Sequence, residues 1–200
     1  QYPARRSPAG SGVGNAKRTN FMSENPTEGP NAAQAEYWRG SGGERWTTHK
    51  APHDTMLSPL TEKALGAVGF APGQRVLDLG CGSGIFSCLF AKSGASTTAV
   101  DLTEAAIDIA RRTAEAHEAD VAIARMDAEK LAFRPGSFDF IYSWGVLHHT
   151  SNIEAAFAEA ARVVKPAGTG LVMVYHRHSL TYYLHGLYWL IVRGKAFQGH

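Results

Sequence analysis

The sequence predicts an α/β fold, with a doubly wound, mostly parallel sheet and helices on both faces. From about residue 74 to residue 175, short apolar runs alternate with amphipathic segments of helix length. This alternation is typical of βαβ units. A glycine-rich loop at 80–84 separates the first apolar run from the first helix. Sheets of this kind bind ligands beyond the carboxyl ends of their strands.

The first elements follow in chain order. Residues 74–79 (QRVLDL) predict a buried strand, 85–92 a helix, and 96–100 a second strand that ends at Asp101. Thr103 is a typical helix cap, and the apolar spacing after it predicts a helix to about residue 117. The residues expected on the buried face of that helix are Ala106, Ile109, Ala110 and Thr113.

The remaining elements complete a five-stranded sheet. Strands are predicted at 121–124, 138–143 and 170–175. Ser151 and Glu154 form a capping box, which predicts a helix between the last two strands. We expect that helix to end at Pro166 and Gly168.

Composition excludes several classes of protein. The chain has 200 residues, of which 44% are hydrophobic and 19% charged, so it can bury the core of one domain. Its formal charge of +2 gives no field that favours nucleic acid, and no apolar run reaches the roughly 18 residues of a membrane span. Two cysteines, Cys81 and Cys88, make no disulfide framework, and no signal peptide opens the chain, which favours the cytoplasm.

The chain divides into three regions. Residues 1–33 are rich in Pro, Gly, Ser and Arg and predict a disordered tail, and Met22 is a candidate for the true start. Residues 34–70 predict a helical segment that carries aromatic and charged side chains and could pack outside the sheet. Residues 71–200 form the core.

The glycine loop follows the strand segment Val-Leu-Asp-Leu at 76–79. A dinucleotide-binding fingerprint counted from Gly80 needs a small residue at position 85, where this chain has Ile85. Asp78 would also repel a pyrophosphate, whereas it would attract a cationic ligand. The loop therefore favours a nucleotide-like ligand that carries positive charge.

At this point the sequence resembles a known family. VLDLGCGSG at 76–84 is similar to motif I of the class I S-adenosylmethionine-dependent methyltransferases, of the small-molecule, type 11-like kind. FDFIYSWGVLHH at 138–149 resembles motif IV, and ARVVKPAGTGLVMV at 161–174 resembles the helix, turn and strand that follow. Ala167 stands where the family usually has glycine. The resemblance covers residues 36–178 and implies a Rossmann-like fold. It also implies that the helical segment at 34–70 is a lid that closes over the ligand, as the alternative to packing outside the sheet.

The resemblance implies S-adenosylmethionine as cofactor and methyl transfer to an oxygen, nitrogen or carbon nucleophile of a small-molecule acceptor. It assigns Asp78 and the glycine loop to the methionine and ribose parts, Asp101 to the ribose hydroxyls and Asp127 to the adenine amino group. The full set expected to bind cofactor is Asp78, Leu79, Gly80, Cys81, Gly82, Ser83, Gly84, Asp101, Leu102, Met126, Asp127, Ala128, Ser143 and Trp144.

Other residues are candidates for the acceptor side. His148 and His149 could serve as a general base, or could form a structural turn that lines the cofactor. The residues expected to contact the acceptor are Tyr37, Trp46, Tyr175, His176 and Arg177. His176 and His178 lack further ligands in register, so no metal is expected. The apolar segment 180–192 predicts a buried helix or a pocket wall, and the sequence leaves the oligomeric state open.

Three further expectations concern the whole chain. The family's sheet normally has seven strands and only five are visible, so we expect a fragment truncated at its C-terminus. A cofactor-binding partner subunit without catalysis is one alternative function. A nicotinamide-dependent oxidoreductase is another, and Ile85 and Asp78 oppose it.

Overall fold

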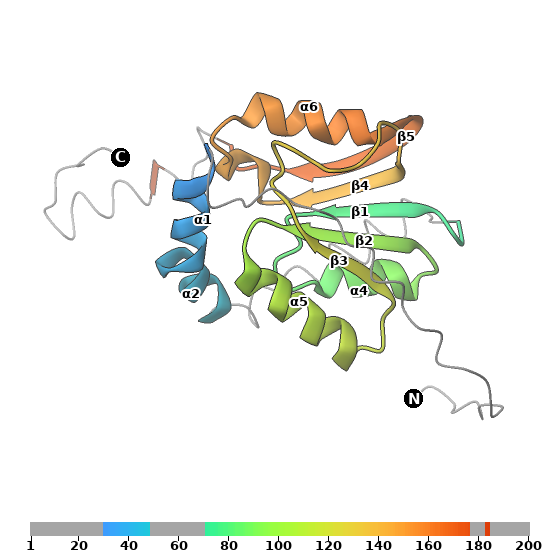
Figure 1. Cartoon of the computed structure of the whole chain (residues 1–200), viewed down its shortest axis with the longest axis horizontal. Helices are drawn as coiled ribbons and strands as arrows, with labels where there is room; N and C mark the ends of the chain where they lie inside the picture. The colour runs from blue at the N-terminus through green and yellow to red at the C-terminus, as the bar shows by residue number, and fades with distance from the viewer. Residues whose placement is uncertain (1–29, 49–70, 177–182, 185–200) are drawn as a thin grey trace, which may run out of the picture.

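The computed structural model describes residues 30–48, 71–176 and 183–184, and its centre is a parallel sheet (Figure 1). The strands are β1 (Arg75–Leu79), β2 (Ser96–Asp101), β3 (Val121–Arg125), β4 (Phe138–Trp144) and β5 (Val164–Met173). They lie in the order β3-β2-β1-β4-β5, and every pair of neighbours is parallel. The predicted doubly wound sheet is thereby confirmed.

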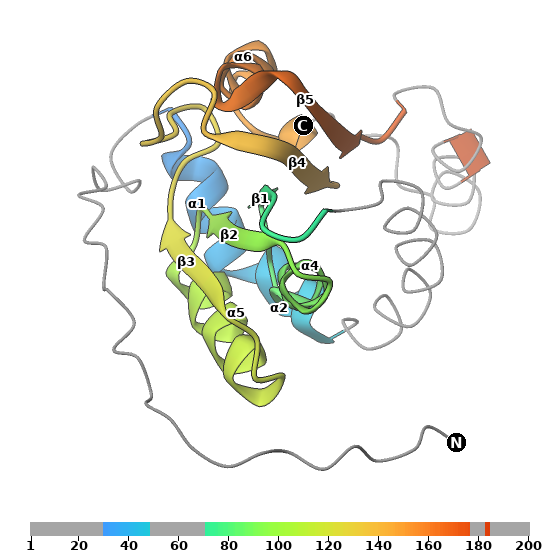
Figure 2. The same ribbon diagram turned by 90° about the vertical axis from the view of Figure 1, so that its right-hand side faces the viewer.

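Helices cover both faces of this sheet. Figure 2 shows α4 (Ile85–Lys92) and α5 (Glu104–Ala116) on one face and α6 (Ile153–Val163) on the other. Because side chains alternate along a strand, Leu77 and Leu79 of β1 pack in a cluster with α6, whereas Val76 packs with Phe90 of α4. All four side chains are buried, so the middle strand is covered on both faces.

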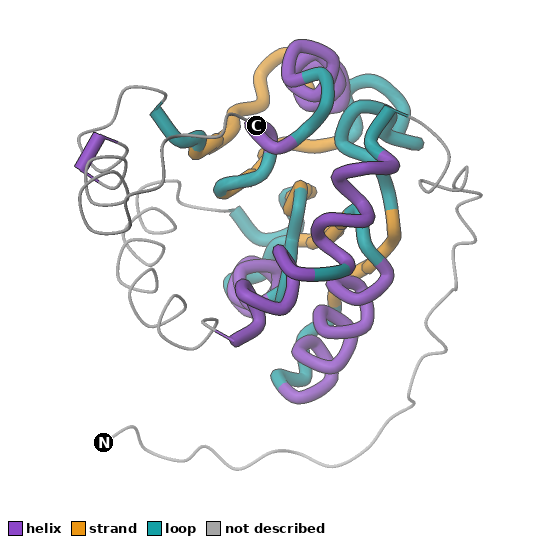
Figure 3. Tube along the Cα trace, turned by 90° about the vertical axis from the view of Figure 1, so that its left-hand side faces the viewer, coloured by secondary structure: helices purple, strands orange, loops and turns teal. Residues whose placement is uncertain are grey.

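Two short helices stand at the end of the sheet to which the strands point. These are α1 (Ala32–Arg39) and α2 (Ser41–Thr48), seen in front of the strands in Figure 3. The predicted boundary of the tail at residue 33 was wrong, because Asn31 is buried and α1 begins at Ala32. Residues 1–29 and 49–70, which carry the rest of the predicted tail and lid, lie outside the described residues.

The structure corrects the helix α6 at both ends. Its cap is Asn152, whose side chain accepts a hydrogen bond from Ala155 N, and not Ser151. The hydroxyl of Ser151 instead donates to the carbonyl of Pro30 at 2.7 Å. The helix ends at Val163, and β5 begins at once and includes the predicted turn at 166–168. A proline is tolerated there because β5 is the outermost strand of the described sheet.

The structure also corrects the buried face of α5. Its buried residues are Ile107, Ala110 and Ala114, so of the predicted face Ala110 is confirmed as buried, whereas Ala106, Ile109 and Thr113 are half-buried. Ala106 and Ile109 lie beside that face and line a cavity instead. The predicted cap is confirmed, because the Thr103 side chain accepts from Ala106 N at 3.3 Å.

Between β4 and α6 lies η1 (Leu147–His149), a single 3₁₀ turn. Of the predicted helix at 180–192, the structure describes only residues 183–184, so that prediction lies outside the described residues. No helix within the described ranges is both long enough and apolar enough to cross a membrane.

Candidate functional site

A cavity of about 360 Å³ lies at the carboxyl ends of the strands. The chain runs outward from β1 to β2 and β3, then returns to place β4 on the other side of β1. The loops after β1 and β4 therefore diverge, and such a switch point is where open α/β sheets bind ligands. Residues of α1 and α2 close part of the opposite wall.

The glycine loop after β1 forms the floor of the cavity. The N–H groups of Gly80 and Cys81 both donate to the carbonyl of Val100, which ties the loop to β2. Gly80 has a φ of +80°, and a Cβ there would lie 2.4 Å from the side chain of Val146. Only glycine allows this close approach between the loops that follow β1 and β4.

Asp78 is buried beneath α4 and borders the cavity. Its side chain is 1% exposed, and its Oδ2 accepts a hydrogen bond of 2.5 Å from the hydroxyl of Ser87. Burial raises the pKa of Asp78 to about 7, with a smaller increase from the charge of Asp101, while the Ser87 bond opposes the shift. A cation placed in this cavity would favour the charged form of Asp78.

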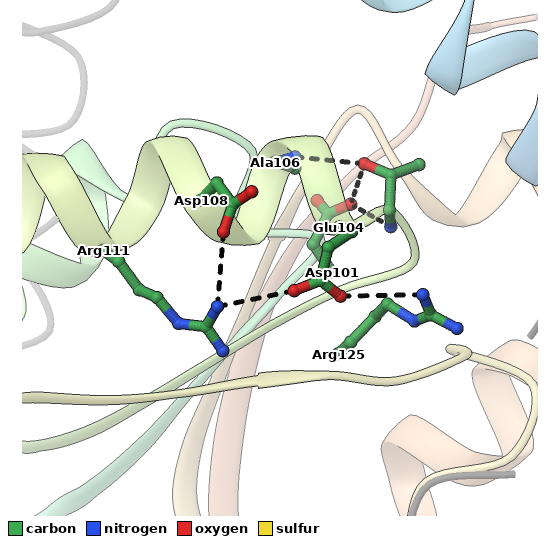
Figure 4. Close-up of polar contacts among 7 residues, drawn as sticks. Asp101, Glu104, Ala106, Asp108, Arg111 and Arg125 are labelled. Atoms are coloured by element: carbon green, nitrogen blue, oxygen red, sulfur yellow. Dashed lines mark hydrogen bonds and ion pairs between the residues drawn. The ribbon is translucent and has the colours of Figure 1, made fainter. Parts of the chain in front are cut away.

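Asp101 lies at the end of β2, where α5 begins (Figure 4). Its Oδ2 accepts from Gly82 N at 3.0 Å and its Oδ1 from Thr103 N at 3.1 Å, so it joins the glycine loop to the start of α5. Burial raises the pKa of Asp101, and these backbone hydrogen bonds hold it down.

Beside Asp101, Figure 4 shows Glu104 between two arginines. Its carboxylate oxygens lie 3.4 Å from Arg111 and 3.6 Å from Arg125. Glu104 is half exposed and does not line the cavity, so these ion pairs belong to the rim.

Asp127 follows β3 and lines the cavity. Both of its carboxylate oxygens accept from Nδ2 of Asn31, at 2.9 and 3.0 Å. Oδ1 also accepts from Glu129 N at 2.9 Å. Asp127 is therefore held by a residue that precedes α1 and by its own turn.

Aromatic side chains make up much of the remaining wall. Phe86, Tyr142 and Trp144 lie on one side, where the rings of Tyr142 and Trp144 are stacked with centroids 6.2 Å apart. Trp38 and His149 lie on another, edge to face at 5.2 Å. Such walls suit a flat, apolar ligand and exclude water.

The two neighbouring histidines differ in position. His149 lines the cavity, whereas His148 does not and packs against Tyr175 with ring centroids 4.4 Å apart. Burial lowers the pKa of both rings, and the neighbouring His149 lowers that of His148 further. Both nitrogens of His148 are buried without a hydrogen-bond partner in the described part of the chain. His149 is thus the better placed of the two to accept a proton.

The structure brings most of the predicted cofactor residues to one cavity. Those that line it are Asp78, Leu79, Gly80, Cys81, Gly82, Ser83, Asp101, Leu102, Met126, Asp127, Ala128 and Trp144. Gly84 packs against Ala110 instead, at a φ of +75°. Ser143 is fully buried, and its hydroxyl donates to the carbonyl of Leu79 at 2.9 Å. Gly84 and Ser143 thus support the glycine loop through contacts outside the cavity.

None of the predicted acceptor residues whose side chains are described lines the cavity. Tyr37 is 48% exposed and lies outside the lining, where it contacts the edge of Trp38. Tyr175 is 66% exposed and His176 is exposed, and neither lines the cavity. Trp46 belongs to α2, but its side chain lies outside the described residues, as does Arg177.

Some lining residues were missed by the sequence reasoning. Asn31, Gln34 and Trp38 all line the cavity, and their spacing of three and four residues places them on one helical face. That spacing was a usable signal. Phe86 and Tyr142 carried no such signal, because an aromatic residue after a glycine loop or within a strand is usually core.

The charges around the cavity favour a cationic ligand. Among the described side chains, Glu44, Asp78, Asp101 and Asp127 line it, against the guanidinium of Arg39. The described residues contain no group of three His, Cys, Asp or Glu side chains that could hold a metal ion. The acidic lining therefore suits an organic ligand with a positive centre.

Comparisons with known proteins identify relatives of this chain. A family model described as "Methyltransferase domain" matches residues 77–172. A protein named "Ubiquinone biosynthesis O-methyltransferase" from Rhizobium leguminosarum bv. trifolii (strain WSM2304) is 33% identical over 153 residues, which are 73% of this chain and 60% of that protein. One of the same name from Dechloromonas aromatica (strain RCB) is 32% identical over 158 residues, 76% of this chain and 67% of that protein.

The fold has relatives among solved structures as well. The PH0226 protein from Pyrococcus horikoshii OT3 is 28% identical, with a TM-score of 0.57, over 77% of this chain and 71% of that one. The match to the Rhizobium protein covers about 60% of that protein's length, so this chain spans only part of it.

Proposed function

The chain belongs to the class I S-adenosylmethionine-dependent methyltransferase family, and on that premise we propose that it methylates a nucleophile on a small-molecule acceptor. The observation that carries this proposal is the convergence of three carboxylates, Asp78, Asp101 and Asp127, on one cavity from the ends of successive strands. A nicotinamide dinucleotide would bring a pyrophosphate to the same glycine loop, where Asp78 would repel it.

The residues present fit the cofactor. Asp101 has two carboxylate oxygens for the two ribose hydroxyls, and Asp127 has acceptor capacity for the adenine amino group. Leu102, Met126 and Ala128 supply apolar contacts beside them. Asp78 and the glycine loop complete the set toward the methionine part.

When bound, S-adenosylmethionine would supply an electrophilic methyl group on a sulfonium, whose sulfur would leave as a neutral thioether. The chain's own residues align the acceptor and exclude water. Trp38, Trp144 and His149 are the lining residues suited to the acceptor. Burial lowers the pKa of His149 and so favours its neutral ring, which can accept the proton that the acceptor loses.

The acceptor atom that we propose is an oxygen. The relatives in Rhizobium and Dechloromonas are named as O-methyltransferases of ubiquinone biosynthesis, which supports a hydroxyl group on a small molecule as the nucleophile. The aromatic walls of the cavity support an acceptor with a planar ring.

Titration calorimetry tests the cofactor assignment. S-adenosylhomocysteine should bind and NADH should not, which would eliminate the oxidoreductase alternative. Asp101→Ala should weaken binding by roughly 1–3 kcal/mol, since it leaves ligand hydroxyls unpaired. Glu104→Ala, an exposed carboxylate nearby, is the matched control and should leave the affinity unchanged. Equal affinity of the Asp101→Ala and original chains would refute the ribose assignment.

Activity separates the enzyme from a non-catalytic partner subunit. The full-length gene product should transfer an isotopically labelled methyl group to at least one hydroxylated aromatic compound in a screen. Tight binding of S-adenosylhomocysteine with no transfer to any acceptor would favour the partner subunit.

A further inference from the structure

Asn31 is a buried polar residue that immediately precedes helix α1 in the sequence. Its side chain is 2% exposed and lines the cavity. Burying an amide is costly unless its hydrogen bonds are satisfied. The partners of this amide come from two loops of the core, about a hundred residues away in sequence.

The contacts fix the orientation of the Asn31 amide. Oδ1 accepts from the backbone N–H of Ser151 at 2.8 Å. A backbone N–H can only donate, so the amide oxygen must face Ser151 and the amide nitrogen must face Asp127. Nδ2 then donates to the two oxygens of Asp127 at 2.9 and 3.0 Å.

Asp127 keeps acceptor capacity after these contacts. Its oxygens accept from Asn31 and from Glu129 N. A carboxylate offers about four lone-pair sites, so room remains for a further donor. A carboxylate held on both oxygens cannot rotate freely, and a fixed acceptor selects its partner better than a mobile one.

The geometry points to Asn31 as a positioning residue for purine recognition: it holds the Asp127 carboxylate for the amino group of the cofactor's adenine. This inference rests on the proposed function and adds to it a residue outside the family-like core motifs. Because Asn31 directly precedes α1, the hydrogen bonds that seat this helix also orient the purine acceptor.

Two substitutions at Asn31 distinguish its proposed role in positioning the Asp127 carboxylate from a role in docking α1 on the core. Asn31→Asp is isosteric, so it keeps the oxygen that accepts from Ser151 but replaces the donor to Asp127 with a repelling oxygen. Asn31→Ala removes both contacts. Glu36→Ala, at an exposed position of the same helix outside the cavity lining, is the control.

The measurement is titration calorimetry of the full chain with two ligands, S-adenosylhomocysteine and S-inosylhomocysteine. They differ in the purine, where the second has an oxygen in place of the amino group. Both Asn31 variants should lower the preference for the adenine ligand by about tenfold, the effect of one charge-assisted hydrogen bond. Adding either change to Asp127→Ala should lower it no further, because the two residues act as one unit.

Other outcomes would overturn the inference. Equal weakening of both ligands would mean that Asn31 only seats α1. An unchanged or tighter affinity of the Asn31 variants for S-adenosylhomocysteine would mean that Asn31 is idle or competes with the ligand. If Asn31→Ala fails to fold by circular dichroism, Asn31→Asp decides. If the unsubstituted chain binds no S-adenosylhomocysteine, the proposed function itself fails, which is a distinct result.

Discussion

The buried carboxylate of Asp78 makes the stability of the ligand-free protein depend on pH. Its pKa rises from 3.8 to about 7 on folding, chiefly because burial penalises the charged form. The folded state therefore holds this proton more tightly than the unfolded chain does. Stability is highest when Asp78 is protonated in both states, and it falls as pH rises from about 4 to about 7.

The magnitude follows from the difference between the two pKa values. About three pKa units correspond to about 4 kcal/mol of folding free energy, reached in full above pH 7. Asp78→Asn removes the ionisation but keeps an oxygen that can accept from Ser87. The variant should exceed the original chain in stability by an amount that grows by about 4 kcal/mol between pH 4 and pH 8.

Urea unfolding of both chains without ligand, at several pH values across this range, measures the difference. Asp139→Asn is a control of opposite sign, because Lys165 lowers the pKa of half-buried Asp139, so its carboxylate stabilises the fold above about pH 4. A stability difference for Asp78→Asn that stays constant with pH would refute the reasoning. It would mean that Asp78 is equally ionised in the folded and unfolded states.

Three further changes test the supports of the site. Gly84→Ala puts a methyl group 2.9 Å from the Cβ of an alanine on α5 and should lower the free energy of unfolding by at least about 2 kcal/mol. Gly73→Ala, also at positive φ but in open space, is the control and should lower it by about 1 kcal/mol. Equal losses in urea unfolding would contradict this reasoning. Ser143→Ala should cost about 1 kcal/mol by losing its bond to Leu79, read as a lower melting temperature. His149→Ala should reduce acceptor turnover more than S-adenosylhomocysteine affinity; the reverse order would assign His149 to the cofactor.

Much of the site could be predicted because its residues obey local rules and match motifs of the family that the sequence resembles. The glycine loop and Asp78 are contiguous with a strand whose apolar pattern is clear, and Asp101 ends the next strand. The carboxyl ends of parallel strands meet at one edge of the sheet, so residues placed there by sequence must converge. The cavity lining at Gly80, Asp101 and Asp127 follows from this geometry.

Two of the errors, the boundary of the tail and the cap of α6, share one cause, which is contact between segments far apart in the chain. The residues before α1 read as tail because they are polar and flanked by glycine and proline. Their partners, Asp127 and Ser151, lie 96 and 120 residues away. No local pattern reports a contact of that separation.

The same contact explains why the capping box was misplaced. Ser151 and Asn152 are both good caps by type, so local preference cannot choose between them. The carbonyl of Pro30 accepts a hydrogen bond from the hydroxyl of Ser151, and Oδ1 of Asn31 accepts one from the Ser151 N–H. Because Ser151 is engaged in this way, Asn152 caps α6 instead. The N-terminal segment thus determines where a core helix begins. Asn31 also contacts Asp127, so the start of α6 and the acceptor proposed for the purine both depend on this residue. A change at Asn31 should therefore be felt in the stability of α6 as well as in ligand selectivity, and hydrogen exchange at Ala155 N would register it.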